Sequence, residues 1–263
     1  MTPIRVFFWR GLNFGDALSP LVVAHVSGRP VDWAGPAGCE LFAVGSVISL
    51  IGPRFAQKPI DAPRPWMWGS GMLSPQATPF IGRIEVAALR GPITATLTGQ
   101  PPALPFGDPG LFAAELLDER PERGDRIGLI PHWRLVDDPE MQALAADPRI
   151  DLIDPRTNDA LEVIRRIAAC RFVLTSSLHG LVVADSLGVP NHWLTPTGNH
   201  ACATLKFLDY AAAIGRHLGT PLDPDEVPDY LAGRLPDHLP YAAGIAAAQQ
   251  ALRESFPTAL KAN

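Results

Sequence analysis

The stretch TSSLHGLVVADSLGVP, residues 175–190, marks the point where an apolar strand passes into a helix. Residues 171–175 predict the strand, and the apolar positions of residues 181–187 follow a helical face that ends at Gly188. His179 therefore lies at the N-terminus of the predicted helix. Free backbone N–H groups and the positive end of the helix dipole favour an anion there, so the position suits a phosphate or a carboxylate.

Strands and helices alternate on both sides of this stretch in the second half of the chain. The predicted elements are strands at 127–130, 150–153 and 189–194 and helices at 140–145 and 158–169. Such alternation is typical of a parallel sheet with right-handed crossovers, whose ligands bind beyond the carboxyl ends of the strands.

The first half of the chain repeats the pattern with more irregular spacing. It predicts strands at 4–9, 41–45, 66–69 and 84–89, a short strand within 101–110, and helices at 15–26, 93–97 and 111–117. We interpret the apolar run of residues 41–51 as a buried strand and its exit. Both NFGD, residues 13–16, and SSLHG, residues 176–180, then follow strands at the ligand-binding edge.

The charged segment DERPERGDR, residues 118–126, contains no apolar residue and predicts a domain boundary. We therefore expect an α/β protein with one Rossmann-like domain in residues 1–120 and a second in 126–205. Residues 206–263 predict a helical tail, with helices at 207–218 and 241–256, that packs back on the first domain.

Composition excludes several classes of protein. A formal net charge of -5 and the absence of a basic run argue against a nucleic acid partner. The three cysteines are widely spaced, and His192 and His200 lack ligand partners at suitable spacing, so neither disulfides nor a metal site is indicated. The longest apolar run falls short of the roughly 18 residues of a membrane span, and the N-terminus does not resemble a signal peptide. We expect a cytoplasmic protein.

His179 has two interpretations on the residues alone. It is either a plain histidine at a helix cap or a titratable group beside a bound anion. Its neighbours favour the second, because Ser176 and Ser177 offer hydroxyls and Gly180 permits close backbone approach.

Several motifs in order resemble those of the polysaccharide pyruvyltransferases, particularly the short bacterial enzymes that attach pyruvate ketals to exopolysaccharide repeat units. The resemblance covers roughly residues 4–215. The motifs are WxxxNFGD at 9–16, WGSG at 68–71, LRGP at 89–92, GDP at 107–109, SSLHGLVVA at 176–184 and KFLDY at 206–210.

This resemblance implies two Rossmann-like domains facing a cleft, as in GT-B glycosyltransferases. It also implies phosphoenolpyruvate as donor and two hydroxyls of one sugar, commonly on a lipid-linked oligosaccharide, as acceptor. His179 matches the histidine of the family's HG motif, and we assign it as the general acid that protonates the enol carbon. A lipid-linked acceptor would bring the enzyme to the membrane surface, and no cofactor is implied.

Arg90 matches a family arginine that contacts the donor, although an exposed, solvated arginine is the plainer interpretation from sequence alone. A guanidinium grips phosphate or carboxylate in a bidentate manner, which favours the donor role. Many family members carry RxHG, whereas this chain has Ser177 in place of that arginine. Arg134, Lys206 or Arg10 are the candidates to supply the missing charge.

Three further groups are candidate site residues. Asn13 and Gly15 are expected at the substrate edge, and Asp16 is either a carboxylate in the first turn of a helix or the group that orients or deprotonates an acceptor hydroxyl. Gly69 and Ser70 either end a strand tightly or line the acceptor pocket. His132 and the adjacent tryptophan follow a strand at the same edge and suit a hydrogen bond and a sugar-stacking ring, although core packing explains the tryptophan equally well.

Two other functions remain open from sequence. A GT-B-like glycosyltransferase could hold a nucleotide sugar diphosphate at SSLHG, and a non-catalytic carbohydrate-binding member would explain the missing arginine.

Overall fold

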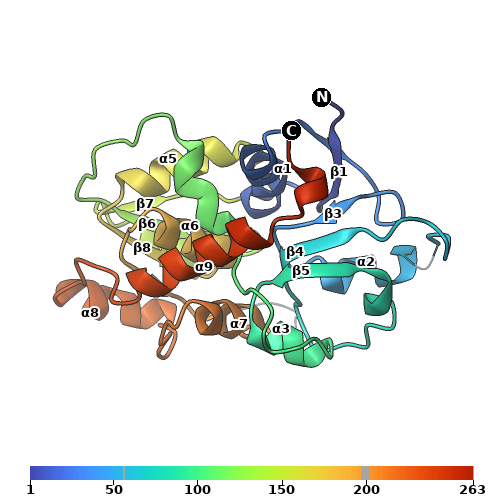
Figure 1. Cartoon of the computed structure of the whole chain (residues 1–263). Helices are drawn as coiled ribbons and strands as arrows, with labels where there is room; N and C mark the ends of the chain where they lie inside the picture. Colours follow the sequence, from blue (N-terminus) through green and yellow to red (C-terminus); the bar gives the residue numbers. More distant parts are fainter. Residues whose placement is uncertain (56, 197–201, 263) are drawn as a thin grey trace.

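The computed structural model describes residues 1–55, 57–196 and 202–262, which form two parallel sheets flanked by helices (Figure 1). The first sheet has the strand order β2-β1-β3-β4-β5, and every pairing in it is parallel. Its strands are β1 Ile4–Phe7, β2 Val31–Trp33, β3 Leu41–Phe42, β4 Trp66–Ser70 and β5 Glu85–Leu89.

Helical elements lie between the strands of the first sheet or follow its last strand. They are α1 Phe14–Ser27, α2 Ile48–Phe55, η1 Ile81–Arg83, α3 Pro92–Leu97 and η2 Pro109–Leu116, the η elements being 3-10 helices. The sequence fixes both ends of α1. Asn13 caps its start by accepting from the N–H of Gly15, and Gly28 ends it with a left-handed φ of 70°, which glycine adopts without strain.

The second sheet winds in the same way, with the order β7-β6-β8-β9 and only parallel pairs. Its elements are β6 Ile127–Ile130, α4 Pro139–Ala145, β7 Ile150–Leu152, α5 Ala160–Ala169, β8 Phe172–Thr175, α6 Leu178–Ser186 and β9 Asn191–Trp193. Helix α6 is buried over nearly all its length, which explains its nearly uniform apolar sequence.

The tail is helical and crosses the molecule. It contains α7 Leu205–Ala213, η3 Pro224–Glu226, α8 Val227–Ala232, α9 Ala242–Ser255 and η4 Thr258–Leu260. Helix α9 packs on β4 and β5, where the indole N–H of Trp68 donates to the Leu252 carbonyl and its ring lies 4.9 Å from that of Phe256. Figure 1 shows α9 across the front of the molecule and both termini on the same side.

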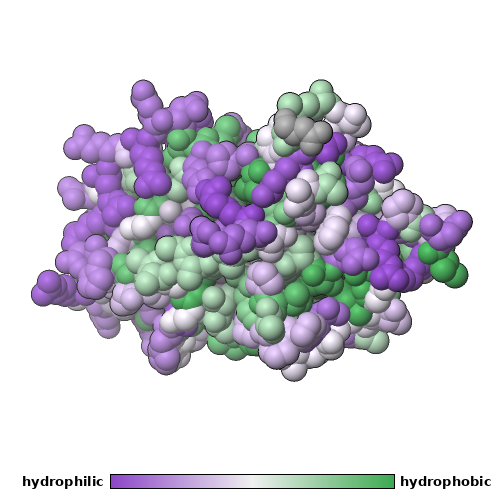
Figure 2. Space-filling model, viewed as in Figure 1, coloured by the Kyte–Doolittle hydropathy of each residue, from purple (hydrophilic) through white to green (hydrophobic). Residues whose placement is uncertain are grey.

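The surface agrees with this arrangement of helices. In Figure 2 hydrophilic side chains cover most of the part over α5 and β7, whereas weakly hydrophobic side chains follow α9, which is rich in alanine. Within the described residues, no helix is long and apolar enough to cross a membrane.

The parallel α/β architecture with helices is confirmed, whereas several predicted elements are wrong in detail. Only Leu41 and Phe42 of the run 41–51 form a strand, and its end already belongs to α2. No strand forms within 101–110, where a single bridge pairs Leu89 with Phe106. The helix expected at 111–117 is the 3-10 helix η2. The helix expected at 207–218 is α7, which already ends at Ala213.

The division into domains at 118–126 stays a prediction. The largest hydrophobic cluster continues from one sheet to the other, since it includes Ile4 and Val22 of the first half and Ile130 and Val183 of the second. Residues 118–126 are exposed, whereas the apolar side chains of the two halves are in contact in one hydrophobic cluster.

The strand order of the two sheets indicates where a ligand site is expected. In each sheet the strand order reverses once, between β1 and β3 in the first and between β6 and β8 in the second. At such a point the loops leave the two strands in opposite directions and open a crevice at their carboxyl ends.

Candidate active site

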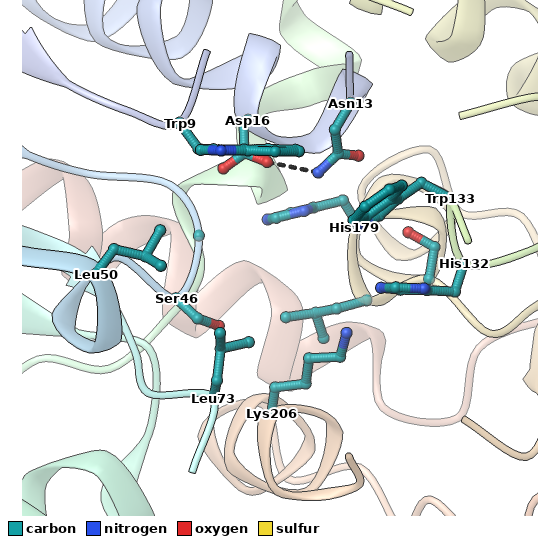
Figure 3. Close-up of a pocket in the computed structure, with 13 residues that line it drawn as sticks. Trp9, Asn13, Asp16, Ser46, Leu50, Leu73, His132, Trp133, His179 and Lys206 are labelled. Carbon is teal, nitrogen blue, oxygen red and sulfur yellow. Dashed lines mark hydrogen bonds between the residues drawn. The ribbon is translucent and has the colours of Figure 1, made fainter. Parts of the chain in front are cut away.

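A cavity of about 220 Å³ opens at both of these switch points together. Its lining combines the loops after β1, β3 and β4 with those after β6 and β8 (Figure 3). From the first half come Trp9, Asn13, Asp16, Gly45, Ser46, Leu50 and Leu73, and from the second come His132, Trp133, Ser177, Leu178, His179 and Lys206.

His179 lines this cavity from the first turn of α6 and is 8% exposed. Its ring packs against Gly15, where a Cβ would lie 2.1 Å from Nδ1, so the close approach requires glycine. Burial, then the ammonium of Lys206 and the guanidinium of Arg90, lowers the pKa of His179 to about 3. The imidazole is neutral at pH 7 until an anion offsets this cost.

Asp16 and Asn13 form the wall opposite Lys206. The amide of Asn13 donates to Oδ2 of Asp16 over 2.5 Å, and Asn13 also caps α1. Burial raises the pKa of Asp16 to about 6, although this hydrogen bond and the ammonium of Lys206 both oppose the rise. A carboxyl group with a pKa so close to neutrality is suited to accept a proton from a hydroxyl.

Lys206 lies in the first turn of α7, and Figure 3 shows it reaching into the pocket from the side opposite Asp16 and Asn13. Its ammonium forms no ion pair with a carboxylate of the described residues. Burial and then the guanidinium of Arg90 lower the pKa of Lys206 to about 8. An unpaired cation inside a cavity favours an anionic ligand, because the ligand would relieve the cost of burial.

The start of α6 provides a second anion-binding element. Ser177 occupies the N-cap position, but its side chain caps no backbone N–H of the helix. The neighbouring serine has a different role, since Oγ of Ser176 accepts from the N–H of His132 and thereby joins two loops of the site. Gly180 lies against β8, where a Cβ would be 2.4 Å from Oγ1 of Thr175, so it serves helix packing instead of lining the cavity.

Aromatic rings form the remaining wall. The rings of Trp9 and Trp133 lie 5.8 Å apart although they follow strands of different sheets, and His132 lies 5.7 Å from Trp133. The guanidinium of Arg134 covers the Trp133 ring at 4.8 Å and is not part of the cavity lining. The cavity therefore combines charged groups on two opposite walls with a pair of aromatic rings.

Arg90 is not an exposed arginine, and the structure places it behind the pocket wall. It is fully buried, its Nε donates to Asp209 on α7, and its Nη1 and Nη2 donate to Oγ of Ser46 and the carbonyl of Met72. Its guanidinium joins β5 to α7 and reaches the cavity only through Ser46. The donor contact stays a prediction without a direct geometric basis.

Gly69 and Ser70 also lie outside the cavity lining. Gly69 has a φ of 82°, and a Cβ there would be 2.3 Å from the ring of Pro109. The hydroxyl of Ser70 donates to the carbonyl of Gly45. The tight strand end is therefore the role that the geometry supports, although Ser70 does fix the loop that carries Gly45 and Ser46. Arg10 is likewise turned away, since its guanidinium lies 5.1 Å from the ring of Trp33.

Asp108 is the residue of this region that sequence reasoning missed. It is fully buried after β5, and its Oδ2 lies 3.8 Å from Nε2 of His179. Burial raises the pKa of Asp108 to about 6. The GDP motif was a signal for it, but the motif alone does not indicate which side chain its carboxylate faces.

Metal ligands are not gathered at this site. Across the described residues, no three His, Cys, Asp or Glu side chains are placed to hold a metal ion, and His200 lies outside those residues.

Two doubly wound parallel sheets whose switch points share a cavity define an α/β protein of Rossmann-like halves, and the charge of Lys206 in that cavity favours an anionic ligand. Residues 4–198 match the family described as polysaccharide pyruvyl transferase, and the chain belongs to that family. The resemblance inferred from the motifs is thereby confirmed.

Individual relatives agree over part of the chain. Succinoglycan biosynthesis protein ExoV of Rhizobium meliloti is 30% identical over 132 residues, which are 50% of this chain and 41% of that protein. The uncharacterized protein L143 of Acanthamoeba polyphaga mimivirus is 32% identical over 119 residues, 43% of this chain and 41% of its own length. The chain thus matches less than half the length of either relative.

A solved structure shares the fold. An uncharacterized protein of Klebsiella pneumoniae superposes with a TM-score of 0.50 at 15% identity, covering 84% of this chain and 92% of its own.

Proposed function

We propose that this protein transfers the pyruvate unit of phosphoenolpyruvate to two hydroxyls of one sugar as a cyclic ketal. The observation that carries the proposal is the unpaired ammonium of Lys206 in the same cavity as His179 and the uncapped start of α6. A donor with a phosphate and a carboxylate supplies the negative charge that this arrangement lacks.

The reaction adds one proton to the donor and removes two protons from the hydroxyls of the acceptor. The enol carbon C3 takes a proton from His179 and becomes a methyl group, and positive charge develops at C2. Two sugar hydroxyls then form bonds to C2 while the C2–O bond to phosphate breaks. Of the two hydroxyl protons, one is accepted by Asp16 and leaves with the phosphate, and the other returns to the imidazole.

Donor binding makes His179 able to act as this acid. With its pKa at about 3 the imidazole of the donor-free protein is neutral at pH 7 and lacks the second proton, because burial and the cations of Lys206 and Arg90 oppose protonation. A bound phosphate and carboxylate neutralise those cations and raise the pKa of His179. The imidazole of His179 therefore becomes protonated only after the donor has bound.

Asp16 and the aromatic wall belong to the acceptor in this proposal. The Asp16 carboxylate, with its pKa raised to about 6, accepts a hydroxyl proton, and the rings of Trp9 and Trp133 stack on the apolar face of a sugar. The position of Lys206 opposite Asp16 and Trp9 fits two different substrates bound side by side.

The cellular setting follows from the same proposal. The name of the Rhizobium relative mentions succinoglycan biosynthesis, and we propose a comparable exopolysaccharide repeat unit, carried on a lipid, as the acceptor. Phosphoenolpyruvate is a cytoplasmic metabolite, which places the reaction in the cytoplasm with peripheral contact to the membrane. The GT-B-like placement of the two halves is proposed with it, and no cofactor takes part.

The decisive experiment is binding followed by turnover. Added phosphoenolpyruvate should raise the melting temperature, whereas UDP-sugars and other phosphorylated metabolites should not. With a pyruvate-free exopolysaccharide repeat unit, inorganic phosphate should then be released in step with ketal formation. Turnover of a nucleotide sugar would establish the glycosyltransferase instead, and sugar binding without any turnover would establish a non-catalytic protein.

His179→Ala tests the assignment of the acid. Ketal formation should fall by about 10²- to 10⁴-fold while phosphoenolpyruvate still binds through Lys206. Turnover near that of the unaltered protein would remove His179 from the mechanism.

A further inference from the structure

Two buried polar atoms face each other beside the cavity, and neither has a hydrogen-bond partner. They are Oδ2 of Asp108 and Nε2 of His179, which lie 3.8 Å apart. Buried polar groups are nearly always satisfied, so a facing pair of orphans at a site calls for an explanation. Only two other side chains of the described residues, Ser19 and Trp193, share this condition, and neither lines the cavity.

Asp108 is held rigidly in its place. It is the N-cap of η2, and its Oδ1 accepts from the N–H of Gly110. Its other oxygen is free to face the imidazole. A carboxylate is fully satisfied only when both oxygens accept hydrogen bonds, so Oδ2 of Asp108 remains available as an acceptor beside His179.

The two ring nitrogens of His179 have different surroundings. Nε2 is sealed from solvent and faces Asp108, whereas Nδ1 lies against Gly15 and is not among the sealed, unpartnered atoms. Nδ1 is therefore the nitrogen that a ligand in the cavity can reach. The remaining charged groups around the ring are Asp16 on α1, Lys206 on α7 and Arg90 after β5, and none of them forms an ion pair with Nε2.

We infer that Asp108 is a positioning residue whose Oδ2 accepts the Nε2–H of His179, so that Nδ1 is the nitrogen that exchanges a proton with the donor. This inference rests on the proposed function for the identity of the donor. A movement of roughly 1 Å brings the two atoms from their present separation to hydrogen-bond distance. A carboxylate in this position fixes the tautomer of an imidazole and stabilises its protonated form.

The proton path is complete without any further group. When the donor is bound, Nδ1 carries the additional proton and Nε2–H donates to the Asp108 carboxylate. The Nδ1–H bond breaks as the C3–H bond forms, and the imidazole returns to its neutral form with its proton on Nε2. Asp108 remains ionised throughout, so it stabilises charge and does not transfer a proton.

The test is the tautomer of His179, read by ¹⁵N NMR of the protein labelled at histidine, with His179→Gln to assign the signal. The unaltered protein should show a protonated Nε2 and an unprotonated Nδ1. Asp108→Asn keeps the Oδ1 cap of η2 but presents an amide N–H toward Nε2, and it should move the proton to Nδ1. Turnover should fall by about 10²- to 10⁴-fold, with KM for phosphoenolpyruvate changed by less than about threefold.

Asp16→Asn is the matched control, because it removes the carboxylate that lines the cavity, which forms no ion pair with Nε2. It should leave the tautomer unchanged. An unprotonated Nε2 in the unaltered protein, or an unchanged tautomer in a folded Asp108→Asn, would overturn the inference. If that variant fails to fold, the spectrum of the unaltered protein alone decides. The tautomer is read without donor, so its result is independent of whether phosphoenolpyruvate is the substrate.

Discussion

Replacing Lys206 with methionine should make the protein more stable and a weaker binder of phosphoenolpyruvate at the same time. The ammonium lines the cavity without an ion pair to a carboxylate of the described residues, and the attraction of Asp16 does not offset the cost of its burial, so the charge destabilises the free protein. Methionine keeps the length and apolar character of the side chain and removes the charge.

The effect on stability can be worked out from the pKa of Lys206. A decrease from 10.5 to about 8 corresponds to at most ~3 kcal/mol, since each unit is about 1.4 kcal/mol. The folded protein loses this proton more readily than the unfolded chain, so the penalty is full below pH 8 and disappears above pH 10.5. Lys206→Met should therefore be more stable by about 1 to 3 kcal/mol at pH 7 and gain nothing near pH 11.

The effect on binding follows from the charge that is lost. A hydrogen bond between charged groups contributes about 1.5 to 3 kcal/mol, so the Kd for phosphoenolpyruvate should rise by about 10- to 150-fold. In the unaltered protein the Kd should also rise as the pH passes 8, because Lys206 then loses its proton. Denaturant unfolding measures the first effect, and calorimetric titration from pH 6 to 10 measures the second.

Two variants control the interpretation. Lys206→Arg keeps the charge and should bind phosphoenolpyruvate without the decline above pH 8. Ser177→Arg restores the arginine of RxHG, and combined with Lys206→Met it should recover most of the lost affinity. The reasoning is refuted if Lys206→Met binds the donor as tightly as the unaltered protein, or if it is less stable at pH 7.

Three further outcomes are expected from the geometry. Gly15→Ala places a Cβ 2.1 Å from Nδ1 of His179 and should reduce turnover by at least about tenfold with unchanged secondary structure, as kinetics and circular dichroism will show. Arg90→Gln leaves the buried carboxylate of Asp209 without its ion pair, so the free energy of unfolding, measured with denaturant, should fall by about 3 to 5 kcal/mol. A loss of affinity for phosphoenolpyruvate without this destabilisation would instead make Arg90 a donor ligand. Asp16→Asn should stabilise the protein at pH 8 and not below pH 4, because the pKa of Asp16 rises from 3.8 to about 6 on folding; equal stability at both pH values would contradict the burial argument.

The regular half of the fold was predictable because local sequence and burial agree there. Strand β6 and helix α6 lie within a residue or two of the predicted bounds, since each is a short apolar run ended by a helix cap, a proline or a glycine. Helix α2 was missed because its first residues continue the apolar run of β3 without a polar cap. A run of buried residues carries no period from which to separate strand from helix.

Site residues were predictable where the position of a residue within its own helix or strand determines whether it lines the cavity. His179 and Asp16 start helices, and both line the cavity as expected of helix starts at the sheet edge. The burial of Arg90 was not predicted, because its partner Asp209 is 119 residues away and no local pattern shows that the tail will cover an arginine at a strand end. Asp108 was missed for the same reason, since its facing group lies in the other half of the chain.

Helix α7 explains why one cation can replace another in this site. Asp209 fastens α7 to the first half through Arg90, and the next residue, Tyr210, fastens it to α6 by donating to Asp185. Lys206 lies one turn earlier on the same helix and faces the cavity. Because α7 is held by Arg90 of the first half and by Asp185 of the second, Lys206 is placed at the cavity, and we propose that the charge missing at Ser177 comes from the tail.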